Sequence, residues 1–442
     1  MKAWVRTFGC RANQADSETL RAALQARGVT LVDHAAEADV AVFNSCAVTA
    51  EAEADLRQGV RRAARENSRL ATVVMGCASA LDRGAIARLP GVQGVVAGGD
   101  VDAVVAALGL PRAAMPVAGP QSGARALLRI QDGCAEHCTF CATTLARGAH
   151  RSRAGTAIVD DARTLARWHP EIVLTGTHIG HYGTDCGSTL GALLARLVRE
   201  VPDARFRLTS VEATEVDDTL ASLLRGESGP DHASPGHGDA LRVAPSLHAP
   251  LQSGSDAVLR RMGRHWYTAA SYARAVGRLV RDRDVFALGA DVIAGFPGES
   301  EADHRATVAL VESLPFTYLH VFPYSARPGT PATRLGDAVP VPEVARRAAE
   351  LRALGARKAG AYAASRDAGR ADVVVTGAGR ERTGLTEDYL SVVLEDSSVP
   401  RRTRLAVRLV HTGAGRLVAS AVASDAAIHP AFAAPEPAPV SA

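Results

Sequence analysis

Three cysteines lie close together about a third of the way along the chain. Cys134, Cys138 and Cys141 stand four and then three residues apart, so one loop can wrap three thiolates around a single metal centre. One interpretation is a structural zinc site with His137 or a distant residue as fourth ligand. The other is a [4Fe–4S] cluster held by three cysteines, which leaves one iron open to a small molecule.

Three further cysteines are far apart in sequence but share a topological position. Cys10, Cys46 and Cys77 each come just after an apolar run that reads as a buried strand. In a parallel sheet all three would emerge at the carboxyl edge, where ligands bind. This favours a second cluster with three protein ligands over three unrelated small core residues. We interpret Cys186, the seventh cysteine, as incidental.

The first 105 residues carry the pattern of an α/β domain. Strands are expected at 3–8, 40–43 and 71–75, with helices at 17–27 and 51–66. This alternation predicts a small parallel sheet covered by helices. Residues 106–124 contain three prolines and read as a linker.

A second α/β alternation spans residues 125–365 and predicts a partial (β/α)6 barrel. Its six expected strands are 126–131, 172–175, 205–208, 247–249, 286–293 and 318–321. The cysteine triplet follows the first of these strands, and polar or glycine-rich segments follow the other five. Active sites of such barrels lie at these strand ends. Residues 226–239 interrupt the pattern and read as a surface insertion, in which His232 and His237 are solvated rather than metal ligands.

The C-terminal region changes to short β-like runs. After a helix at 341–370, strands are expected at 371–376, 389–394, 404–410 and 417–422. Residues 366–425 therefore predict a small β-barrel. The tail 426–442, rich in alanine and proline, is expected to be disordered.

The composition limits the functional class. The net charge of +3 over 442 residues does not by itself predict a polyanion partner. The chain has neither a run of about 20 apolar residues nor an apolar signal-peptide core, so we expect a cytoplasmic protein without a membrane span. Seven cysteines argue against a closed disulfide set and favour metal ligands.

Taken together, the motifs resemble those of the radical S-adenosylmethionine (SAM) methylthiotransferases from residue 3 to about 425. The segments that carry this resemblance are 8–14 (FGCRANQ), 44–49 (NSCAVT), 76–77 (GC), the triplet with its C-x3-C-x2-C spacing, 146–148, 248–255 (HAPLQSGS), 291–299 (DVIAGFPGE) and 320–325 (HVFPYS). The resemblance implies a radical SAM partial barrel and a C-terminal TRAM-like domain that binds RNA.

The family has three branches, which act on isopentenyladenosine in tRNA, on threonylcarbamoyladenosine in tRNA, or on a ribosomal-protein aspartate. Residues 10–14 (CRANQ), 48–52 (VTAEA) and 174–183 (LTGTHIGHYG) are most similar to the threonylcarbamoyladenosine branch. The resemblance therefore implies methylthiolation of C2 of N6-threonylcarbamoyladenosine at position 37 of tRNA. The chain departs from the family at 142–146, where an Ile-Pro pair is usual, and at the 226–239 insertion.

The resemblance also implies cofactors and roles. Two [4Fe–4S] clusters and SAM are expected, with one cluster on the catalytic Cys134, Cys138 and Cys141 and the other on Cys10, Cys46 and Cys77. The first cluster cleaves SAM to a 5′-deoxyadenosyl radical, the second supplies sulfur, and a second SAM supplies the methyl group. Candidate SAM-binding residues are Gln252, Ser253, Gly254, Gly295, Phe296, Pro297, Gly298 and Glu212, with Arg264 as a further contact to SAM or substrate.

The expected partners are the anticodon loop of tRNA, an electron donor such as flavodoxin or ferredoxin, and a sulfur source. Two groups of basic side chains are candidates for phosphate contacts or for a solvated basic face; they are Arg147, His150, Arg151 and Arg153, and Arg401, Arg402, Arg404 and Arg408. Isopentenyladenosine tRNA and a ribosomal-protein aspartate remain alternative substrates. A non-catalytic, zinc-stabilised RNA-binding module is an alternative of another class.

Overall fold

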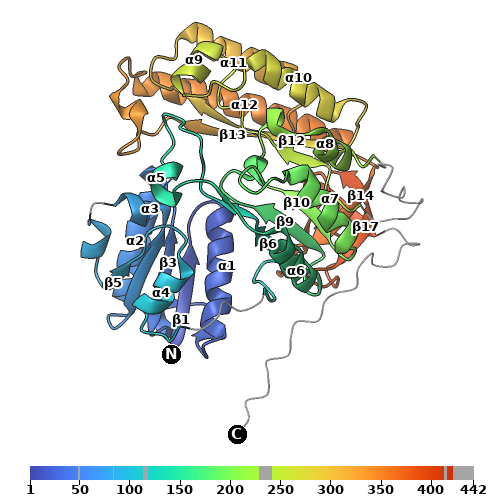
Figure 1. Ribbon diagram of the computed structural model, residues 1–442. Helices are drawn as coiled ribbons and strands as arrows, with labels where there is room; N and C mark the ends of the chain where they lie inside the picture. The colour runs from blue at the N-terminus through green and yellow to red at the C-terminus, as the bar shows by residue number, and fades with distance from the viewer. Residues whose placement is uncertain (48–49, 83, 113–117, 228–240, 413–415, 422–442) are drawn as a thin grey trace.

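The computed structural model describes residues 1–47, 50–82, 84–112, 118–227, 241–412 and 416–421. His232, His237 and the tail 426–442 lie outside these ranges. Figure 1 shows an N-terminal α/β unit beside a curved set of strands and helices, with a small β unit at the far side of the latter. Among the described residues, no helix has the length and apolarity that a membrane span requires.

The N-terminal unit is built on a five-stranded, wholly parallel sheet of order β2-β1-β3-β4-β5. Its strands are β1 (Lys2–Thr7), β2 (Thr30–Leu31), β3 (Val40–Ser45), β4 (Ala71–Gly76) and β5 (Val92–Val95). Its helices are α1 (Arg11–Gln25), α2 (Ala50–Glu66), α3 (Cys77–Leu81) and α4 (Val101–Ala107), with short 3-10 turns η1 (Ala35–Glu37) and η2 (Ile86–Arg88). Both faces of β3 are buried because separate apolar clusters cover them. The parallel α/β prediction is confirmed.

Six parallel strands form the predicted partial barrel. They are β6 (Ala126–Arg129), β9 (Glu171–Thr175), β10 (Arg205–Leu208), β11 (Ser246–His248), β12 (Ala287–Ala294) and β13 (Tyr318–Pro323). Two three-stranded sheets, β10-β9-β6 and β11-β12-β13, are joined by parallel bridges from Phe206 to Val243 and from Ser210 to His248. The barrel stays open between β6 and β13.

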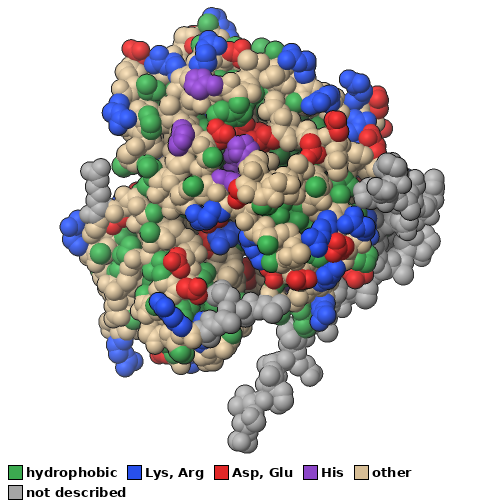
Figure 2. Space-filling model, viewed as in Figure 1, with side chains coloured by type: hydrophobic (Ala, Val, Ile, Leu, Met, Phe, Trp, Pro, Cys, Tyr) green, Lys and Arg blue, Asp and Glu red, His purple; other side chains and the backbone are tan. Residues whose placement is uncertain are grey.

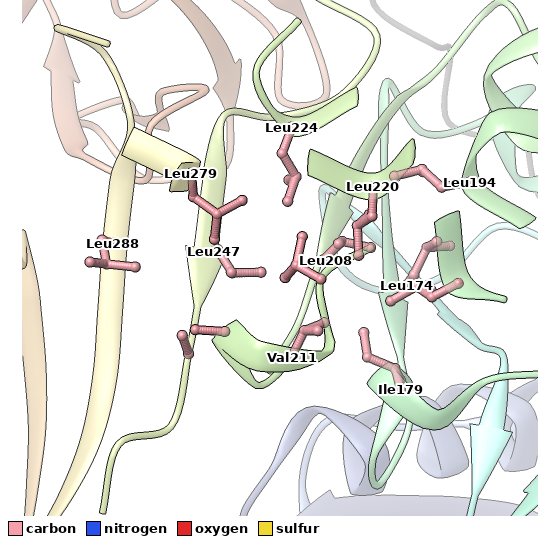
Figure 3. Packing of buried hydrophobic residues seen from close by; sticks show 14 of the residues in the cluster. Leu174, Ile179, Leu194, Leu208, Val211, Leu220, Leu224, Leu247, Leu279 and Leu288 are labelled. Carbon is pink, nitrogen blue, oxygen red and sulfur yellow. The ribbon is translucent and has the colours of Figure 1, made fainter. Parts of the chain in front are cut away.

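Helices surround the outside of this barrel. They are α6 (Gly155–Ala166), α7 (Leu190–Glu200), α8 (Asp218–Leu224), α9 (Asp256–Arg261), α10 (Ala269–Val280), α11 (Glu301–Ser313) and α12 (Val341–Ser365). Figure 3 shows leucines of neighbouring strands packed against leucines of α7, α8 and α10, namely Leu174, Leu208, Leu247, Leu194, Leu220, Leu224 and Leu279. This outer layer fixes the strands whose carboxyl ends carry the candidate site.

Smaller elements shape the loops at those strand ends. They are β7 (Gln131–Asp132), β8 (Arg151–Ser152), α5 (Thr143–Arg147), η3 (Ile179–His181), η4 (Ala213–Glu215) and η5 (Pro331–Arg334). In Figure 1, α5 lies beside α3 of the N-terminal unit. The loop after the first barrel strand therefore meets the carboxyl edge of the N-terminal sheet.

The C-terminal strands form a closed barrel of order β14-β15-β16-β18-β17, in agreement with the predicted fold class. The strands are β14 (Arg370–Val375), β15 (Thr383–Leu385), β16 (Ser391–Leu394), β17 (Arg404–His411) and β18 (Leu417–Ala421). Buried charges attach this barrel to the amino ends of β9 and β10. Arg205 pairs with Glu171 at 2.6 Å and with Asp372 of β14 at 3.1 Å. The attachment leaves the carboxyl ends of the strands accessible.

One buried histidine makes stability depend on pH. His169, fully buried before β9, accepts a hydrogen bond from the Gln121 backbone N at 3.0 Å, and its Nδ1 faces the Ala124 carbonyl at 3.2 Å. Burial lowers its pKa to about 4. Since the unfolded side chain titrates near 6.5, the unfolded state binds more protons between these values. The contribution of His169 is complete above pH 6.5 and is lost as the pH falls toward 4.

We therefore expect acidification from pH 7.5 to 5 to cost the wild-type protein about 2 kcal/mol of unfolding free energy through His169. His169→Gln should lack this increment, because glutamine does not titrate. Urea unfolding of both proteins at the two pH values measures it. Parallel pH dependences of the two proteins would contradict the assignment.

Candidate functional site

The loop with Cys134, Cys138 and Cys141 is held from both ends. The Cys134 backbone N donates to the Gly148 carbonyl at 3.1 Å. Farther along, Thr139 N and Oγ1 donate to the Met262 and Arg261 carbonyls at 2.8 and 2.9 Å. These bonds tie the loop to the end of α9 and fix all three thiols at the mouth of the barrel.

Each thiol of this loop has a polar neighbour. Arg264 Nη1 donates to Cys138 Sγ at 3.4 Å, and the Thr143 backbone N donates to Cys141 Sγ at 3.4 Å. His178 Nδ1 lies 3.5 Å from Cys134 Sγ. Burial raises the pKa of Cys138 to about 12, although Arg264 opposes this shift. Donors around sulfur are typical of sites that hold metal-bound thiolates.

His178 belongs to a pair of stacked histidines. Its ring centroid lies 4.0 Å from that of His181, and both rings contact Glu215, at 2.7 Å for His178 Nε2 and 3.0 Å for His181 Nε2. Burial lowers the pKa of His178, but its hydrogen bonds to Cys134 and Glu215 outweigh burial and raise it to about 10. The same ring therefore contacts the Cys134 thiol on one side and the Glu215 carboxylate on the other.

The second cysteine triplet gathers at the carboxyl edge of the N-terminal sheet. Cys10 precedes α1, Cys46 follows β3 and Cys77 begins α3. Asn13 Oδ1 accepts from Cys10 Sγ at 3.7 Å and from Cys77 Sγ at 3.9 Å. Burial raises the pKa of Cys77 to about 11, and the charges of Cys10 and Cys46 add to this rise. The fold therefore brings these three distant cysteines together.

Arg147 of α5 connects the two cysteine loops. Its guanidinium donates to Cys77 Sγ at 3.2 Å, to Asn13 Oδ1 at 2.6 Å and to Asp16 at 2.8 Å. A fourth bond reaches Asp132 of β7 at 3.0 Å. The side chain is only 2% exposed. The prediction that Arg147 meets tRNA phosphates is wrong, because acids of two units surround it.

Other predicted phosphate contacts also need correction. Arg404 is buried against Asp372, while Arg401 and Arg402 donate to the carbonyls of Ser122 and Gln121. His150 is mostly buried beside Gln131, and Arg153 pairs with Asp161. Arg151 and Arg408 are exposed. Only these last two keep side chains largely in solvent.

The donor sets suit iron–sulfur clusters better than zinc. Two groups in the described part of the chain place three ligand atoms within 4.8 Å of one another, and both consist of histidines and a carboxylate without any cysteine. Tetrahedral zinc with 2.3 Å bonds needs sulfurs about 3.8 Å apart. Neither cysteine triplet is among the groups that place three ligand atoms within 4.8 Å. The seventh cysteine, Cys186, lies in neither of the regions that carry the triplets, so each triplet offers three cysteine ligands.

The candidate SAM-binding segments lie where predicted, after β11 and β12, but several of their groups have partners within the protein. Ser253 Oγ and the Gly254 N contact Thr307 Oγ1 of α11 at 3.2 and 2.9 Å. The Gln252 backbone has a φ of 65° and pairs with Val292. These contacts shape the loop and leave its SAM contacts as predictions.

The Gly295–Glu299 loop is similarly constrained. Phe296 is fully buried and packs edge-to-face on Phe140 of the cysteine loop and on Tyr324. Pro297 accepts from Arg261 at 3.1 Å, and Gly298 donates to Asp337 at 2.8 Å. A side chain at Gly295 would overlap Val344 of α12.

Glu212 is the candidate whose surroundings are most clearly polar. Its carboxylate contacts Arg264 and accepts from Trp266 Nε1 at 2.5 Å. Burial raises its pKa, and Arg264 opposes that shift. Because Arg264 also donates to Cys138, the Arg264 side chain links Glu212 to the cysteine loop.

Sequence reasoning did not assign the His178–Glu215 contact, the internal role of Arg147 or the position of Asp16. His178 lies in a segment that follows the second barrel strand, so its proximity to the mouth followed from topology. Its partner Glu215 and the acids around Arg147 come from other segments. Figure 2 shows histidine and acidic side chains in a hollow near the centre of the molecular face.

Comparisons with known proteins match both large units. Residues 2–98 match the model of Uncharacterized protein family UPF0004, and residues 128–311 match that of the Radical SAM superfamily. The chain is 33% identical to the threonylcarbamoyladenosine tRNA methylthiotransferase MtaB of Aquifex aeolicus, over 77% of this chain and 84% of that protein. The protein of the same name from Bacillus subtilis is 32% identical, over 88% and 89%.

A relative of another name is similarly close. The tRNA-2-methylthio-N(6)-dimethylallyladenosine synthase of Erythrobacter litoralis is 32% identical, over 96% of this chain and 98% of that protein. Among solved structures, the radical SAM methyltransferase TsrM of Kitasatospora setae has a TM-score of 0.55 at 16% identity, covering 75% of this chain and 76% of that chain. The last match supports the fold.

Proposed function

This chain belongs to the radical SAM methylthiotransferases, and we propose that it methylthiolates C2 of N6-threonylcarbamoyladenosine at position 37 of tRNA. It is a transferase of a family that uses SAM and [4Fe–4S] clusters. When bound, these cofactors supply the radical, the sulfur and the methyl group. We assign the catalytic cluster to Cys134, Cys138 and Cys141, and the second cluster to Cys10, Cys46 and Cys77.

The observation that carries this proposal is the contact, through Arg147, between the second cysteine triplet and the segment that carries the first. Its bonds to Cys77, Asn13 and Asp132 hold the second triplet against the loop that follows β6. A reaction that uses two clusters on one substrate atom needs this fixed relation. A zinc-stabilised binding module has no need of it.

The protein groups at the mouth position the reactants and exclude water. We propose that Glu212 and Arg264 orient SAM or substrate, while the Gln252–Gly254 and Gly295–Gly298 segments form the walls of the SAM pocket. His178, Arg264 and the Thr143 backbone stabilise thiolate charge at the first triplet. The tight packing of Phe296 on Phe140 keeps this side of the loop dry.

The threonylcarbamoyl substituent is favoured by residues 10–14 and 174–183 and by the names of the Aquifex and Bacillus relatives. Isopentenyladenosine tRNA is the second candidate, because the Erythrobacter relative is named for it and covers more of the chain. These relatives are all named as tRNA enzymes, which supports RNA over a ribosomal-protein aspartate.

Mass spectrometry of tRNA nucleosides tests the substrate. A strain that lacks this gene is compared with the same strain after the gene is restored. We expect 2-methylthio-N6-threonylcarbamoyladenosine to appear only on restoration. If the isopentenyl counterpart responds instead, the reaction type stands and the branch is wrong. A response of neither nucleoside would contradict tRNA methylthiolation.

A further inference from the structure

A histidine–aspartate–histidine cluster lies on the last three barrel strands. Asp291 Oδ1 is 2.9 Å from His248 Nε2 and 3.3 Å from His320 Nδ1. The two imidazole centroids are 5.0 Å apart. None of these residues belongs to the cysteine triplets or to the predicted SAM-binding set, so the cluster has no role in the function argued above.

The cluster faces the inside of the barrel. Side chains alternate along a strand, and Ala290 and Val292, which flank Asp291, belong to the apolar layer beneath the helices. The same alternation holds on β13, where Leu319 and Val321 pack outward. Asp291 and His320 therefore point inward, as does His248 of β11.

The hydrogen bonds of the cluster leave one polar end accessible. The imidazoles of His248 and His320 hold the pKa of Asp291 well below its ordinary value despite burial, so the carboxylate accepts from both rings. Tyr318 Oη contacts the other nitrogen of His248 at 3.2 Å. His320 is 55% exposed at the open edge of the barrel. Among the described residues, its Nε2 makes no hydrogen bond.

A residue of the C-terminal barrel packs next to this cluster. Tyr389 stacks on Tyr318 with ring centroids 5.4 Å apart, and the Arg207 guanidinium lies 5.4 Å from the Tyr389 ring. Gly289 leaves room for the Tyr318 ring, because a Cβ at residue 289 would overlap the phenol. The wall around the histidines is thus aromatic and polar.

The cluster lies farther from the carboxyl ends of the strands than the predicted SAM-binding loop does. Gly295 follows Asp291 by four residues, which is about 13 Å along an extended strand. In adenine, N1 lies between C2 and C6, and C6 carries N6. If C2 faces the strand ends, where we place the cluster and SAM, N6 therefore points away from them. An N6 substituent that is long enough would extend toward the histidines.

From this placement we propose that His320, oriented by Asp291, binds the polar N6 substituent of the substrate, a carbamoyl-linked amino acid with ureido, hydroxyl and carboxylate groups. The inference rests on the proposed function and names the side chain that would select the substrate. The Nε2 of His320 can accept from a hydroxyl or N–H, or donate to a carboxylate when protonated. A dimethylallyl group offers no such partner, and polar sites reject analogues that lack the expected group.

Binding of synthetic anticodon stem-loops tests the proposal without turnover. Stem-loops with adenosine, isopentenyladenosine or threonylcarbamoyladenosine at position 37 are titrated anaerobically against wild type and variants. We expect His320→Phe, which keeps the aromatic packing, to lose about tenfold or more of the preference for threonylcarbamoyladenosine over adenosine. Affinity for the unmodified stem-loop should stay unchanged.

Two further substitutions test the two ring nitrogens of His320 separately. His320→Asn retains an amide near the Nδ1 position, which faces Asp291, whereas His320→Gln places one near Nε2. We expect glutamine to restore part of the preference and asparagine to restore none. His34→Phe, which changes an exposed histidine of the N-terminal unit, is the matched control and should behave as wild type.

Several outcomes would overturn the proposal. One is an equal loss of affinity for all three stem-loops in His320→Phe, and another is an unchanged preference. A third is the loss of one zinc or iron equivalent from His320→Phe by metal analysis, which would make the cluster a metal site. Failure of the proposed function is distinct: wild type itself would then bind or modify isopentenyladenosine in preference to threonylcarbamoyladenosine.

Discussion

Replacement of Cys134, Cys138 and Cys141 by alanine is expected to reduce SAM cleavage to background. The three thiols are the ligands that we assign to the catalytic cluster, and their loop is fixed by hydrogen bonds of the backbone and of the Thr139 hydroxyl, which the alanine variants retain. With two [4Fe–4S] clusters in wild type, the iron content should fall from about eight to about four per chain. Iron analysis of anaerobically purified protein and the yield of 5′-deoxyadenosine measure these effects.

The reciprocal variant separates the two triplets. Replacing Cys10, Cys46 and Cys77 by alanine should leave SAM cleavage in place and abolish the methylthiolated product. Cys186→Ala is the matched control, because this exposed cysteine belongs to neither triplet and its loss should change neither iron nor product. Two results would contradict the assignment: colour and iron unchanged in either triple variant, or about two zinc atoms per chain in wild type.

The second large effect is expected at Arg147. Arg147→Met retains much of the side-chain volume but leaves the buried Asp16 with Arg129, which is 30% exposed, as its remaining cation partner. Removal of one partner from a buried ion pair costs about 3–5 kcal/mol. We expect destabilisation of that size and a loosened contact between the N-terminal unit and the barrel. Urea unfolding followed by tryptophan fluorescence measures the loss of stability, and limited proteolysis reports on the loosened contact.

Controls show whether charge burial is the cause. Arg151→Met removes an arginine that is 63% exposed in the same segment, and its effect should stay within about 0.5 kcal/mol. Asp16→Asn combined with Arg147→Met should cost less than the sum of the single changes, because the two side chains contact each other. Additive effects would mean that the Arg147–Asp16 pair does not carry the stability.

Sequence reasoning predicted the long periodic elements and missed several of the short ones. The strands β3 and β4 are buried on both faces, and β1 is buried on one face. Their apolar residues therefore form a pattern that is easy to recognise in the sequence. By contrast, β2 has two residues, β5 is half exposed and β15 has a central glycine. Such strands exist because neighbours pair with them, which leaves little trace in local composition.

The positions of the cysteines in the site could be predicted from the sequence, but the surroundings of Arg147 could not. The convergence of Cys10, Cys46 and Cys77 followed from topology alone, since the carboxyl ends of parallel strands share one edge. The environment of Arg147 did not follow. No acid stands between residues 142 and 153, and its partner Asp16 lies 131 residues away. The local charge pattern therefore indicated an RNA contact where the fold formed an internal ion pair.

The sequence by itself determined the family, the order of the three units and the six cysteines, because these depend on residue type, spacing and strand periodicity. Only the tertiary structure decided which charges are internal, which histidine keeps a nitrogen accessible and what joins the two triplets. Those properties depend on contacts between residues far apart in the chain. Asp291 and His320 are neighbours through strand pairing, and Arg147 reaches Cys77 because α5 packs beside α3.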